Sequence, residues 1–480
     1  MSDVYDVCVV GTGAAGVFAA YSFINTGYSV CLIDKQSRLG GTFANAWINN
    51  WIAEPNVSPF KDLYEDLHKP PYQVYGDYAK SWIHKNFSRN NSESGLAFSY
   101  NSESFLNILQ EKFQKNDKIK IYLNAECTSV LCNNGKINSI KIKINAEEKF
   151  IEARFFIDAT GDAVLCRYAG FPTVVGAEGK NTYNESLAPD FDAPSMLNMP
   201  SLIYELTMNP DEAEDLSSVV VSDNISFDGY VYTDGVTGKI FVNPLTGLGV
   251  SGQKGIGDYK EAYSLSVEYR KQHWKKVRDE LEKKHNAGEP DNKVWKGWNV
   301  GQRKYFLSKN YAPMLGIRES YRVKCKKMLT QSDLTVQISS AAIKTKHFIA
   351  CGNHDIDIHG YGSEEIIAFN KEKLCPYGVP LECFIPENSD NVFVAGRCAG
   401  YSHIAAASFR INKSAAQSGW AVGNAVRLLC DKKMNSVKNI DDCFITELQS
   451  EKYTGFFKTV NYLEENVLLE EKCLKKFLCC

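Results

Sequence analysis

The chain has 480 residues, of which 44% are hydrophobic and 23% charged, and its formal net charge is −3. This near-neutral balance, without a basic block, argues against nucleic acid as the main partner. Because a single core stops growing near about 250 to 300 residues, the length predicts two or three lobes. No apolar run of about 18 residues is present, so we expect no membrane span. The lack of a signal-peptide pattern predicts a cytoplasmic protein.

The opening residues 7–16 read VCVVGTGAAG, a buried strand that runs into three glycines in G-x-G-x-x-G spacing. Gly11 supplies the tight turn, Gly13 lets the backbone approach a pyrophosphate, and Gly16 lets helix and strand pack. The following helix is expected over residues 14–25, ended by Gly27. The alternative to a pyrophosphate-binding turn is a glycine turn needed only for packing.

A second buried strand is predicted over residues 29–33, and Asp34 follows it. An acid at this place accepts hydrogen bonds from an adenosine ribose, and its charge disfavours a 2′-phosphate. Strand, glycine turn, helix, strand and acid together are a specific signal for a dinucleotide-binding βαβ unit.

Gly40, Gly41 and Thr42 form a second glycine turn shortly after this acid. In flavoproteins of the glutathione-reductase-like class the flavin half of the cofactor passes over such a loop, which favours FAD over NAD. No His, Cys or Tyr follows until Tyr64, so we expect FAD to be bound non-covalently. Trp47 and Trp51 lack the tryptophan-halogenase spacing and are interpreted as wall or core.

The polar segment 86–101 predicts an exposed loop, and a helix is expected over residues 102–115. Alternation over 118–124 and 136–144, around Asn133-Asn134-Gly135, predicts a hairpin or meander. The run ARFFIDATGD, residues 153–162, repeats the logic of strand, small residues, glycine and acid, and predicts another cofactor turn. A simple strand-ending turn is the alternative.

The 15 cysteines form no C-x-x-C pair, so we expect reduced, buried thiols and no metal site. Cys127 and Cys132 have the C-x-x-x-x-C spacing of disulfide-reductase flavoproteins. A strand over 126–131 sends these side chains to opposite faces, which argues against a redox pair. The backbone near Cys127 remains a candidate for the adenine edge.

Residues 170–301 are the least readable and are assigned to a cap lobe, with an amphipathic helix over 259–284. Gly247, Gly249 and Gly252 formally repeat G-x-G-x-x-G. Pro244 breaks the strand before them and no acid completes the unit, so we reject a nicotinamide site there.

A third block spans LGIRESYRV from residue 315, DIDIHG at 355–360 and PYGVPLECFIP at 376–386. Arg318 and Arg322 are candidates to clamp a carboxylate, and His359 to exchange a proton near physiological pH. The competing interpretation is a buried ion-pair network that joins Arg318 to Glu319 or Asp357.

The run NVFVAG, residues 391–396, predicts a buried strand that ends at Gly396-Arg397 and leads into a helix rich in small residues. The helix amino terminus at Ile411 and Asn412 would stabilise an anionic reduced flavin through its dipole. His403 and Arg410 are expected to face substrate or flavin.

Taken together, VVGTGAAG, GGT, FIDATGD, LGIRES, DIDIHG, YGVPLECFIP and NVFVAGRCAGYSHIAAASFRI resemble the FAD-dependent oxidoreductase family, bacterial flavoproteins related to the succinate dehydrogenase and fumarate reductase-like fold. The resemblance covers most of the chain. It implies that FAD is held by the first glycine loop, the GGT turn, the ATGD turn and the segment from Gly396 to Asn412. Catalysis would take place at the flavin ring, against the cap. The resemblance implies no particular substrate. The helix start SFRINKSAAQSG is more polar than the family pattern.

The expected fold is therefore α/β: a glutathione-reductase-like Rossmann FAD-binding domain with an inserted mixed α+β cap or substrate domain. We assign 1–168 and 376–430 to the FAD-binding lobe, 169–375 to the cap, and 431–480 to a helical appendage whose Cys479-Cys480 end is interpreted as a flexible tail. The residues expected to bind FAD are Gly11, Gly13, Ala14, Ala15, Gly16, Asp34, Lys35, Gly40, Gly41, Thr42, Cys127, Ala159, Thr160, Gly161, Asp162, Gly396, Arg397, Ile411 and Asn412.

The expected activity is hydride transfer between flavin and a small, anionic organic substrate, with Arg318, His359, His403 and Arg410 as catalytic candidates. A flavin monooxygenase or halogenase-like enzyme and a non-catalytic flavin-binding protein are the alternatives. The substrate, the electron acceptor and the oligomeric state stay open.

Overall fold

The protein is described here by a computed structural model. The structure describes residues 3–48, 50–51, 98–99, 102–233, 238–289, 304–360, 364–456 and 460–461. The predicted polar loop at 86–101 falls outside this range except for β4 (Phe98–Ser99), which pairs with β3 (Asn50–Trp51). The Cys479-Cys480 end also lies outside it.

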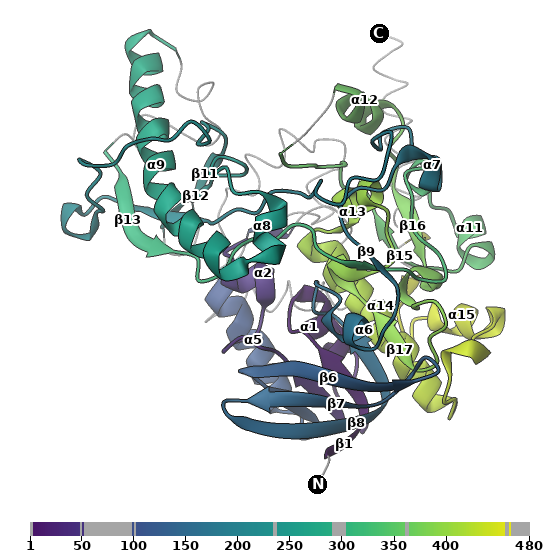
Figure 1. Cartoon of the computed structure of the whole chain (residues 1–480). Helices are drawn as coiled ribbons and strands as arrows, with labels where there is room; N and C mark the ends of the chain where they lie inside the picture. Colours follow the sequence, from purple (N-terminus) through teal and green to yellow (C-terminus); the bar gives the residue numbers. More distant parts are fainter. Residues whose placement is uncertain are drawn as a thin grey trace.

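A parallel sheet forms the centre of the larger lobe (Figure 1). Its strands lie in the order β5-β2-β1-β8, and β17 pairs with the far side of β8. Residues 7–10 and 30–33 are wholly buried, which explains their unbroken apolar runs. The predictions of strands at the start, before Asp34 and at 391–396 are confirmed. The strands are β1 (Asp3–Val10), β2 (Val30–Ile33), β5 (Ile119–Tyr122), β8 (Glu147–Asp158) and β17 (Val392–Val394).

An antiparallel meander continues the sheet from the amino-terminal half of β8. It contains β6 (Ala125–Asn133) and β7 (Lys136–Ile144), joined by a turn in which Asn134 and Gly135 have φ values of 50° and 78°. The predicted meander is confirmed, but its first strand was placed wrongly. Residues 119–122 pair in parallel with β2, because they complete the Rossmann unit, and residues 125–133 form the hairpin strand instead.

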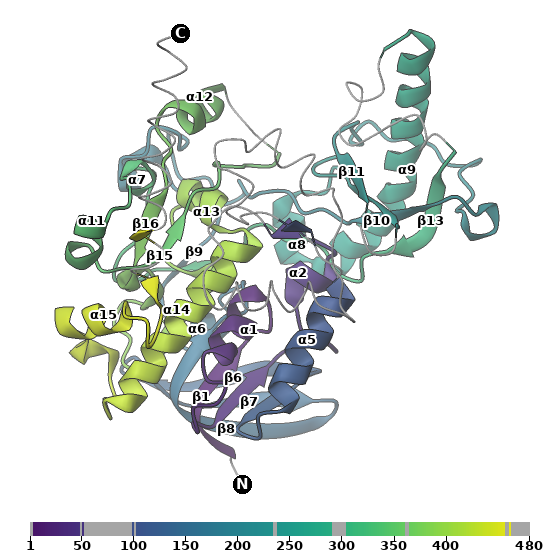
Figure 2. The same cartoon turned by 180° about the vertical axis from the view of Figure 1, so that it is seen from behind.

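Two helices pack against one another beside the sheet with small residues at their contact (Figure 2). They are α1 (Ala14–Tyr21) and α14 (Asn412–Asp431). A β-carbon on Gly419 would fall 1.9 Å from the Ala15 carbonyl oxygen, so the helix backbones approach too closely for a side chain there. Helix α1 ends four residues before the predicted Asn25, which has a φ of 63° that a helix does not accommodate.

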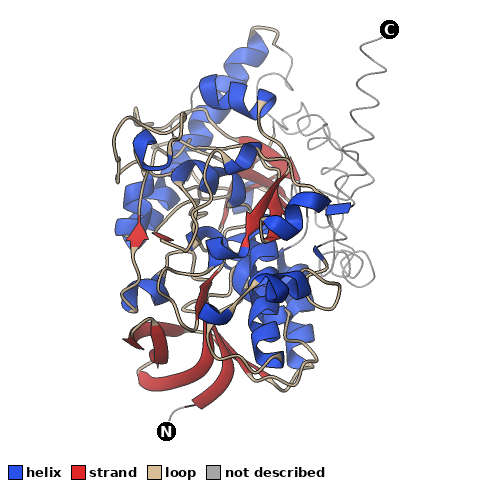
Figure 3. Cartoon of the chain, turned by 90° about the vertical axis from the view of Figure 1, so that its right-hand side faces the viewer, coloured by secondary structure: helices blue, strands red, loops and turns tan. Residues whose placement is uncertain are grey.

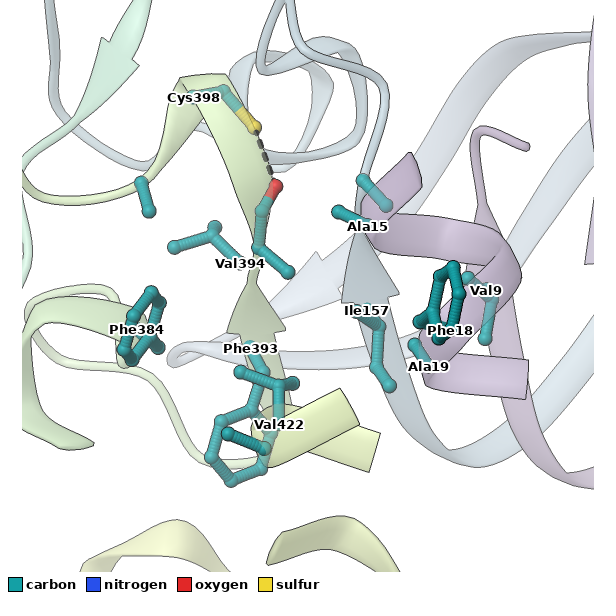
Figure 4. Close-up of a cluster of buried hydrophobic side chains, with 14 of the residues drawn as sticks. Val9, Ala15, Phe18, Ala19, Ile157, Phe384, Phe393, Val394, Cys398 and Val422 are labelled. Carbon is teal, nitrogen blue, oxygen red and sulfur yellow. Dashed lines mark hydrogen bonds between the residues drawn. The ribbon is translucent and has the colours of Figure 1, made fainter. Parts of the chain in front are cut away.

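In the larger lobe, buried side chains pack on both faces of the sheet. Figure 4 shows Ile157 of β8 between Phe18 and Ala19 of α1 and, on the other side, Phe393 of β17 and Val422 of α14. All five side chains are buried. The glycine turns at the carboxyl ends of these strands are therefore carried by rigid elements.

The inserted lobe contains a second, antiparallel sheet in the order β11-β12-β10-β13, with the long helix α9 beside it (Figure 1). Trp274 and Val277 of α9 pack with Tyr204, and the predicted helix over 259–284 is confirmed. The elements are β10 (Tyr204–Thr207), β11 (Tyr230–Thr233), β12 (Ile240–Asn243), β13 (Phe306–Tyr311), α8 (Gly252–Gly257) and α9 (Tyr259–Asn286).

The segment after the inserted sheet returns to the larger lobe. Val323, Ile349 and Phe369 belong to the same hydrophobic core as the Rossmann strands, although the prediction assigned residues up to 375 to the cap. The elements are β14 (Arg322–Val323), which pairs with β9 (Thr173–Val174), β15 (Phe348–Gly352), which pairs with β16 (Tyr377–Pro380), α11 (Ser340–Thr345) and α12 (Glu364–Glu372).

Further helices, drawn in blue with the others in Figure 3, complete the described part of the chain. They are α2 (Gly41–Asn45), α5 (Ser102–Gln114), α6 (Val164–Tyr168), α7 (Lys180–Tyr183), α13 (His403–Phe409) and α15 (Asp442–Leu448), with 3₁₀ turns at Pro210–Glu212, Asp333–Thr335, Leu381–Phe384, Gly396–Cys398 and Val437–Asn439. None of the helices in the described ranges has the length and apolarity needed to cross a membrane. The α/β fold with a Rossmann sheet and an inserted α+β lobe is confirmed.

Candidate active site

A cavity of about 840 Å³ opens at the carboxyl ends of the parallel strands and extends to the inserted lobe. This edge of an open α/β sheet is where ligands bind, because the strand ends and helix amino termini converge there. Sixteen of the residues predicted to bind FAD line this cavity: Gly11, Gly13, Ala14, Ala15, Asp34, Lys35, Gly41, Thr42, Ala159, Thr160, Gly161, Asp162, Gly396, Arg397, Ile411 and Asn412.

The three glycines of the first turn have the separate environments that the spacing predicts. Gly11 has a φ of 101°, and a β-carbon on it would fall 2.4 Å from the Ala159 carbonyl oxygen. A β-carbon on Gly16 would fall 1.7 Å from the Gly11 carbonyl oxygen, so Gly16 contacts the turn and does not line the cavity. Around Gly13 no atom lies within 4 Å of such a carbon, so its backbone is open to a ligand.

The second glycine turn packs directly on the first. Gly40 has a φ of 109° and donates its N–H to the Thr12 carbonyl at 2.9 Å. A β-carbon on Gly41 would meet the Gly13 Cα at 2.8 Å. The two turns therefore form one continuous wall along the cavity, with Gly40 behind it.

Asp34 ends β2 and lines the cavity, but part of its carboxylate already has protein partners. The N–H and hydroxyl of Thr12 donate to its Oδ2 at 2.6 and 2.7 Å, and Gln36 N donates to Oδ1 at 2.8 Å. These bonds orient the carboxylate along the turn. Ribose binding at Asp34 stays a prediction.

A smaller cavity of about 390 Å³ adjoins the Asp34 end and is lined by Ala125, Glu126 and Cys127. Cys127 thus lies beside Asp34 in this cavity, and its place at an adenine edge stays a prediction. Burial raises the pKa of the Cys127 thiol to about 12 and also raises that of Cys132. Both thiols are therefore protonated and unreactive at neutral pH.

The ATGD turn is organised by an acid that the prediction did not single out. Asp158 is fully buried at the end of β8 and accepts hydrogen bonds from Thr160 N and Oγ1 and from Cys166 N, at 2.8 to 3.0 Å. Burial raises its pKa despite these donors. The sequence did contain a signal for this role of Asp158, because it is the one acidic residue at the end of the apolar run FFID, residues 155–158.

Helix α14 begins beside the cavity. Ile411 is its cap residue, in extended conformation, and Asn412 Nδ2 donates to the Ile48 carbonyl at 2.9 Å. Arg410 and Ile411 separate α14 from α13. The predicted helix amino terminus thus lies at the cavity, where its dipole favours negative charge.

Arg318 lines the far end of the cavity, on the segment that joins the two lobes. Its guanidinium donates to the Met199 carbonyl at 2.5 Å and to Ser201 Oγ at 3.3 Å, both uncharged acceptors. Burial and the nearby Arg410 lower its pKa to about 10, so it remains protonated at neutral pH. The competing interpretation, an ion pair of Arg318 with Glu319 or Asp357, is wrong in its arginine, because Glu319 pairs with Arg322 and Asp357 pairs with Arg410.

Asp357, His359 and Arg410 form a hydrogen-bonded group in the same part of the cavity. His359 Nε2 and Asp357 Oδ2 are 2.7 Å apart, and Arg410 Nη2 donates to the same oxygen at 3.0 Å. Although burial raises the pKa of Asp357, His359 and Arg410 lower it well below its usual range. Burial, and then Arg318, lower the pKa of His359 to about 4, so the ring is neutral at pH 7.

Arg322 and His403 lie away from the cavity lining, contrary to the expectation that they face substrate or flavin. Arg322 is fully buried and donates to Glu319 at 2.9 Å and Glu178 at 3.0 Å. His403 Nδ1 lies 2.8 Å from Glu319. Burial opposes ionisation of Glu319, yet His403 and Arg322 lower its pKa to about 2. Sequence spacing did not distinguish these residues from Arg318 and His359.

The inserted lobe supplies cavity residues that the sequence analysis missed, among them Tyr230, Asn243, Ile256, Tyr259 and Met314. No motif marked them, because they come from unconnected parts of the cap. The second G-x-G-x-x-G of the chain, which begins at Gly247 in this lobe, is a packing feature. A β-carbon on Gly247 would fall 2.4 Å from His273 Nε2. Trp47 packs with Phe241 in the core of this lobe, as its interpretation as wall or core predicts.

A dinucleotide needs open backbone beside its pyrophosphate, an acceptor for its ribose hydroxyls and a positive dipole for an anionic ring, and Gly13, Asp34 and the helix start at Ile411 have these properties. The residues therefore fit FAD. Fold and site together define a Rossmann-type flavoprotein oxidoreductase. The chain belongs to the family described as FAD dependent oxidoreductase, which matches residues 6–451, and it is an FAD-dependent enzyme.

Curated relatives match parts of the chain. It is 23% identical over 184 residues to a digeranylgeranylglycerophospholipid reductase of Picrophilus torridus, which covers 36% of this chain and 44% of that protein. It is 33% identical over 76 residues to a 3-oxosteroid 1-dehydrogenase of Mycolicibacterium smegmatis, which covers 15% and 13%. The chain thus spans less than half the length of these relatives.

Among solved structures, a geranylgeranyl bacteriochlorophyll reductase-like protein of Thermoplasma acidophilum is 13% identical with a TM-score of 0.45, over 99% of this chain and 91% of that one. The myxobacterial chondrochloren halogenase CndH is 10% identical with a TM-score of 0.45, over 93% and 78%.

Proposed function

We propose that this enzyme transfers a hydride between bound FAD and a small organic anion that binds at Arg318. The observation that carries the proposal is the charge of the cavity end. Two guanidinium groups, Arg318 and Arg410, lie near the carboxylate of Asp357, while His359 is neutral and the other carboxylate of this part of the cavity, Asp355, is exposed to solvent. The surplus positive charge is suited to a carboxylate, which arginine binds through paired, charge-assisted hydrogen bonds.

Arg318 is the arginine best placed for this role. Arg410 is committed to Asp357 through both the carboxylate and the main-chain carbonyl, whereas Arg318 donates to uncharged acceptors only in its described contacts. A buried guanidinium without a counterion gains most from an incoming anion. The substrate would complete the ion pairing at this end of the cavity.

His359 is proposed to handle the proton. With Asp357 ionised, the neutral ring donates Nε2–H to it and leaves Nδ1 as the proton acceptor. The loop is held in place because His359 N donates to Asn198 Oδ1 at 2.7 Å. An anion on Arg318 would offset the positive charge that lowers the His359 pKa, so substrate binding would raise that pKa toward the working range of a general base.

FAD, when bound non-covalently along the glycine turns, supplies the hydride-accepting ring. The start of α14 and the inserted lobe close the cavity around the reacting groups. The electron acceptor after this step is a separate, unidentified partner.

The test is an anaerobic screen of the purified, FAD-loaded enzyme with small 2-hydroxy, 2-amino and unsaturated carboxylic acids, followed as loss or recovery of flavin absorbance. We expect at least one acid to react while its methyl ester reacts poorly. Arg318→Gln should raise KM for that acid by about 100-fold, the scale of a lost charge-assisted pair. Arg38→Gln, at an exposed ion pair with Glu103, is the charge-matched control.

Equal rates for acid and ester would overturn the anionic substrate. A product that forms only with oxygen and reduced flavin would instead indicate a monooxygenase. Non-covalent binding is checked on the same sample, since acid precipitation should release FAD of unaltered mass into the supernatant.

A further inference from the structure

Arg397 joins the ATGD turn to the segment that carries Arg318. It follows β17 in the turn Gly396–Cys398. Its Nε donates to the Gly161 carbonyl and its Nη2 to Asp162 Oδ1, both at 2.9 Å. On the other side of the same guanidinium, Nη1 donates to the Ile317 carbonyl at 2.7 Å. One planar group therefore connects a turn of the cofactor cavity to the residue directly before Arg318.

The other anchors of residues 315–318 come from the inserted lobe. Leu315 N donates to Tyr259 Oη at 3.0 Å, and Gly316 and Ser201 exchange main-chain hydrogen bonds at 2.8 and 3.3 Å. Arg318 donates a side-chain hydrogen bond to the Met199 carbonyl. Residues 315–318 are therefore hydrogen-bonded mainly to the inserted lobe, and Arg397 connects them to the lobe that contains the Rossmann sheet.

Contact between the guanidinium and the ATGD turn is close. Gly161 has a φ of 74°, and a β-carbon on it would fall 2.8 Å from Arg397 Nη2 and 2.9 Å from Cζ. The guanidinium therefore packs on the main chain of the turn. Gly161 and Asp162 also line the cavity, so Arg397 connects residues that a cofactor would contact to Ile317.

We propose that Arg397 is a positioning residue that couples the two halves of the active site: FAD bound at the ATGD turn orders residues 315–318, and so places Arg318 for the substrate. The proposal rests on the proposed role of Arg318 in anion binding. Arg397 also lines the cavity, but its described side-chain hydrogen bonds go to the Gly161 and Ile317 carbonyls and to Asp162, and these bonds carry the proposal.

Hydrogen exchange of the full chain, with and without saturating FAD, tests the coupling. In the wild type we expect FAD to slow exchange in peptides that cover both 158–164 and 315–318. Arg397→Lys keeps the charge, but its three N–H donors sit on one nitrogen and cannot reach Gly161, Asp162 and Ile317 as the three guanidinium nitrogens do. In this variant the first peptide should stay protected while the second exchanges about tenfold faster. Arg38→Lys, at the exposed ion pair, should match the wild type.

The proposal is overturned if residues 315–318 are protected equally in Arg397→Lys and the wild type, or if FAD leaves them unchanged in both. Benzoate binding to the FAD-loaded enzyme, followed by flavin absorbance, separates the two proposals. Arg397→Lys should weaken it about tenfold through displacement of Arg318. If Arg318→Gln binds benzoate as the wild type does, the anion site fails while the exchange result still decides the coupling.

Discussion

Gly16 lies so close to Gly11 that a β-carbon on Gly16 would fall 1.7 Å from the Gly11 carbonyl oxygen. Gly13 lies between them in the sequence, and a β-carbon built on Gly13 would have no neighbouring atom within 4 Å. The two glycines therefore have different physical tasks, one in packing and the other in leaving space for a ligand.

Gly13→Ala should fold normally and bind FAD poorly. Its φ of −64° suits alanine, and the new methyl group projects into open cavity. A methyl group in the path of the pyrophosphate costs about 1 to 3 kcal/mol, or about five- to 160-fold in Kd. Gly16→Ala should instead lower the Tm of the apoprotein by at least about 5 °C. Flavin fluorescence titration and thermal unfolding measure the two effects, and equal Tm losses would contradict this assignment.

Arg318→Gln and Arg322→Gln should differ in stability, although the two arginines are four residues apart. Removal of Arg322 leaves Glu178 buried without its counterion and Glu319 with His403 alone, at a cost of about 3 to 5 kcal/mol. Arg318→Gln relieves repulsion from Arg410 and should not lower the Tm. Thermal unfolding of the apoproteins checks this, and a larger loss for Arg318→Gln would show that the roles are reversed.

The apoprotein should lose stability as the pH falls from about 6.5 toward 4. Burial lowers the pKa of His273, in the inserted lobe, from 6.5 to about 4. The unfolded chain therefore takes up the proton first, and the contribution of this residue, about 3 kcal/mol, is present above pH 6.5 and lost as the pH falls through 4. His359 acts in the same direction.

Tm measured from pH 7.5 to 4 in the wild type and in His273→Gln checks this linkage. The variant should lose less Tm over the interval, because the substituted side chain binds no proton. Identical pH profiles would place the titration elsewhere.

Cys127 should be chemically inert despite its place beside the cofactor cavity. With a pKa of about 12, its thiol is almost wholly protonated at pH 8, whereas Cys443 is exposed. Iodoacetamide followed by peptide mapping should modify Cys443 well before Cys127, and Cys127→Ser should leave substrate-driven flavin reduction within about twofold of wild type. Rapid labelling of Cys127 would reopen the redox interpretation.

The sequence alone determined the βαβ unit and the cofactor turns, because these features depend on neighbours in the chain. Gly11, Gly13, Gly16 and Asp34 lie within one local unit, and the backbone conformations that they require are encoded by residue type. The apolar runs also marked β1, β2 and β17 as buried strands, and these assemble into one sheet.

Tertiary structure decided which members of the charged motifs face the cavity. Arg318 and Arg322 look equivalent in LGIRESYRV, as His359 and His403 do in their own motifs. The fold turns Arg318 and His359 toward the cavity and buries Arg322 and His403 with Glu319. Some partners are close in sequence, such as Glu319 for Arg322, but others are more than 80 positions away, such as Glu178 for Arg322 and Met199 for Arg318, and a local pattern does not contain these.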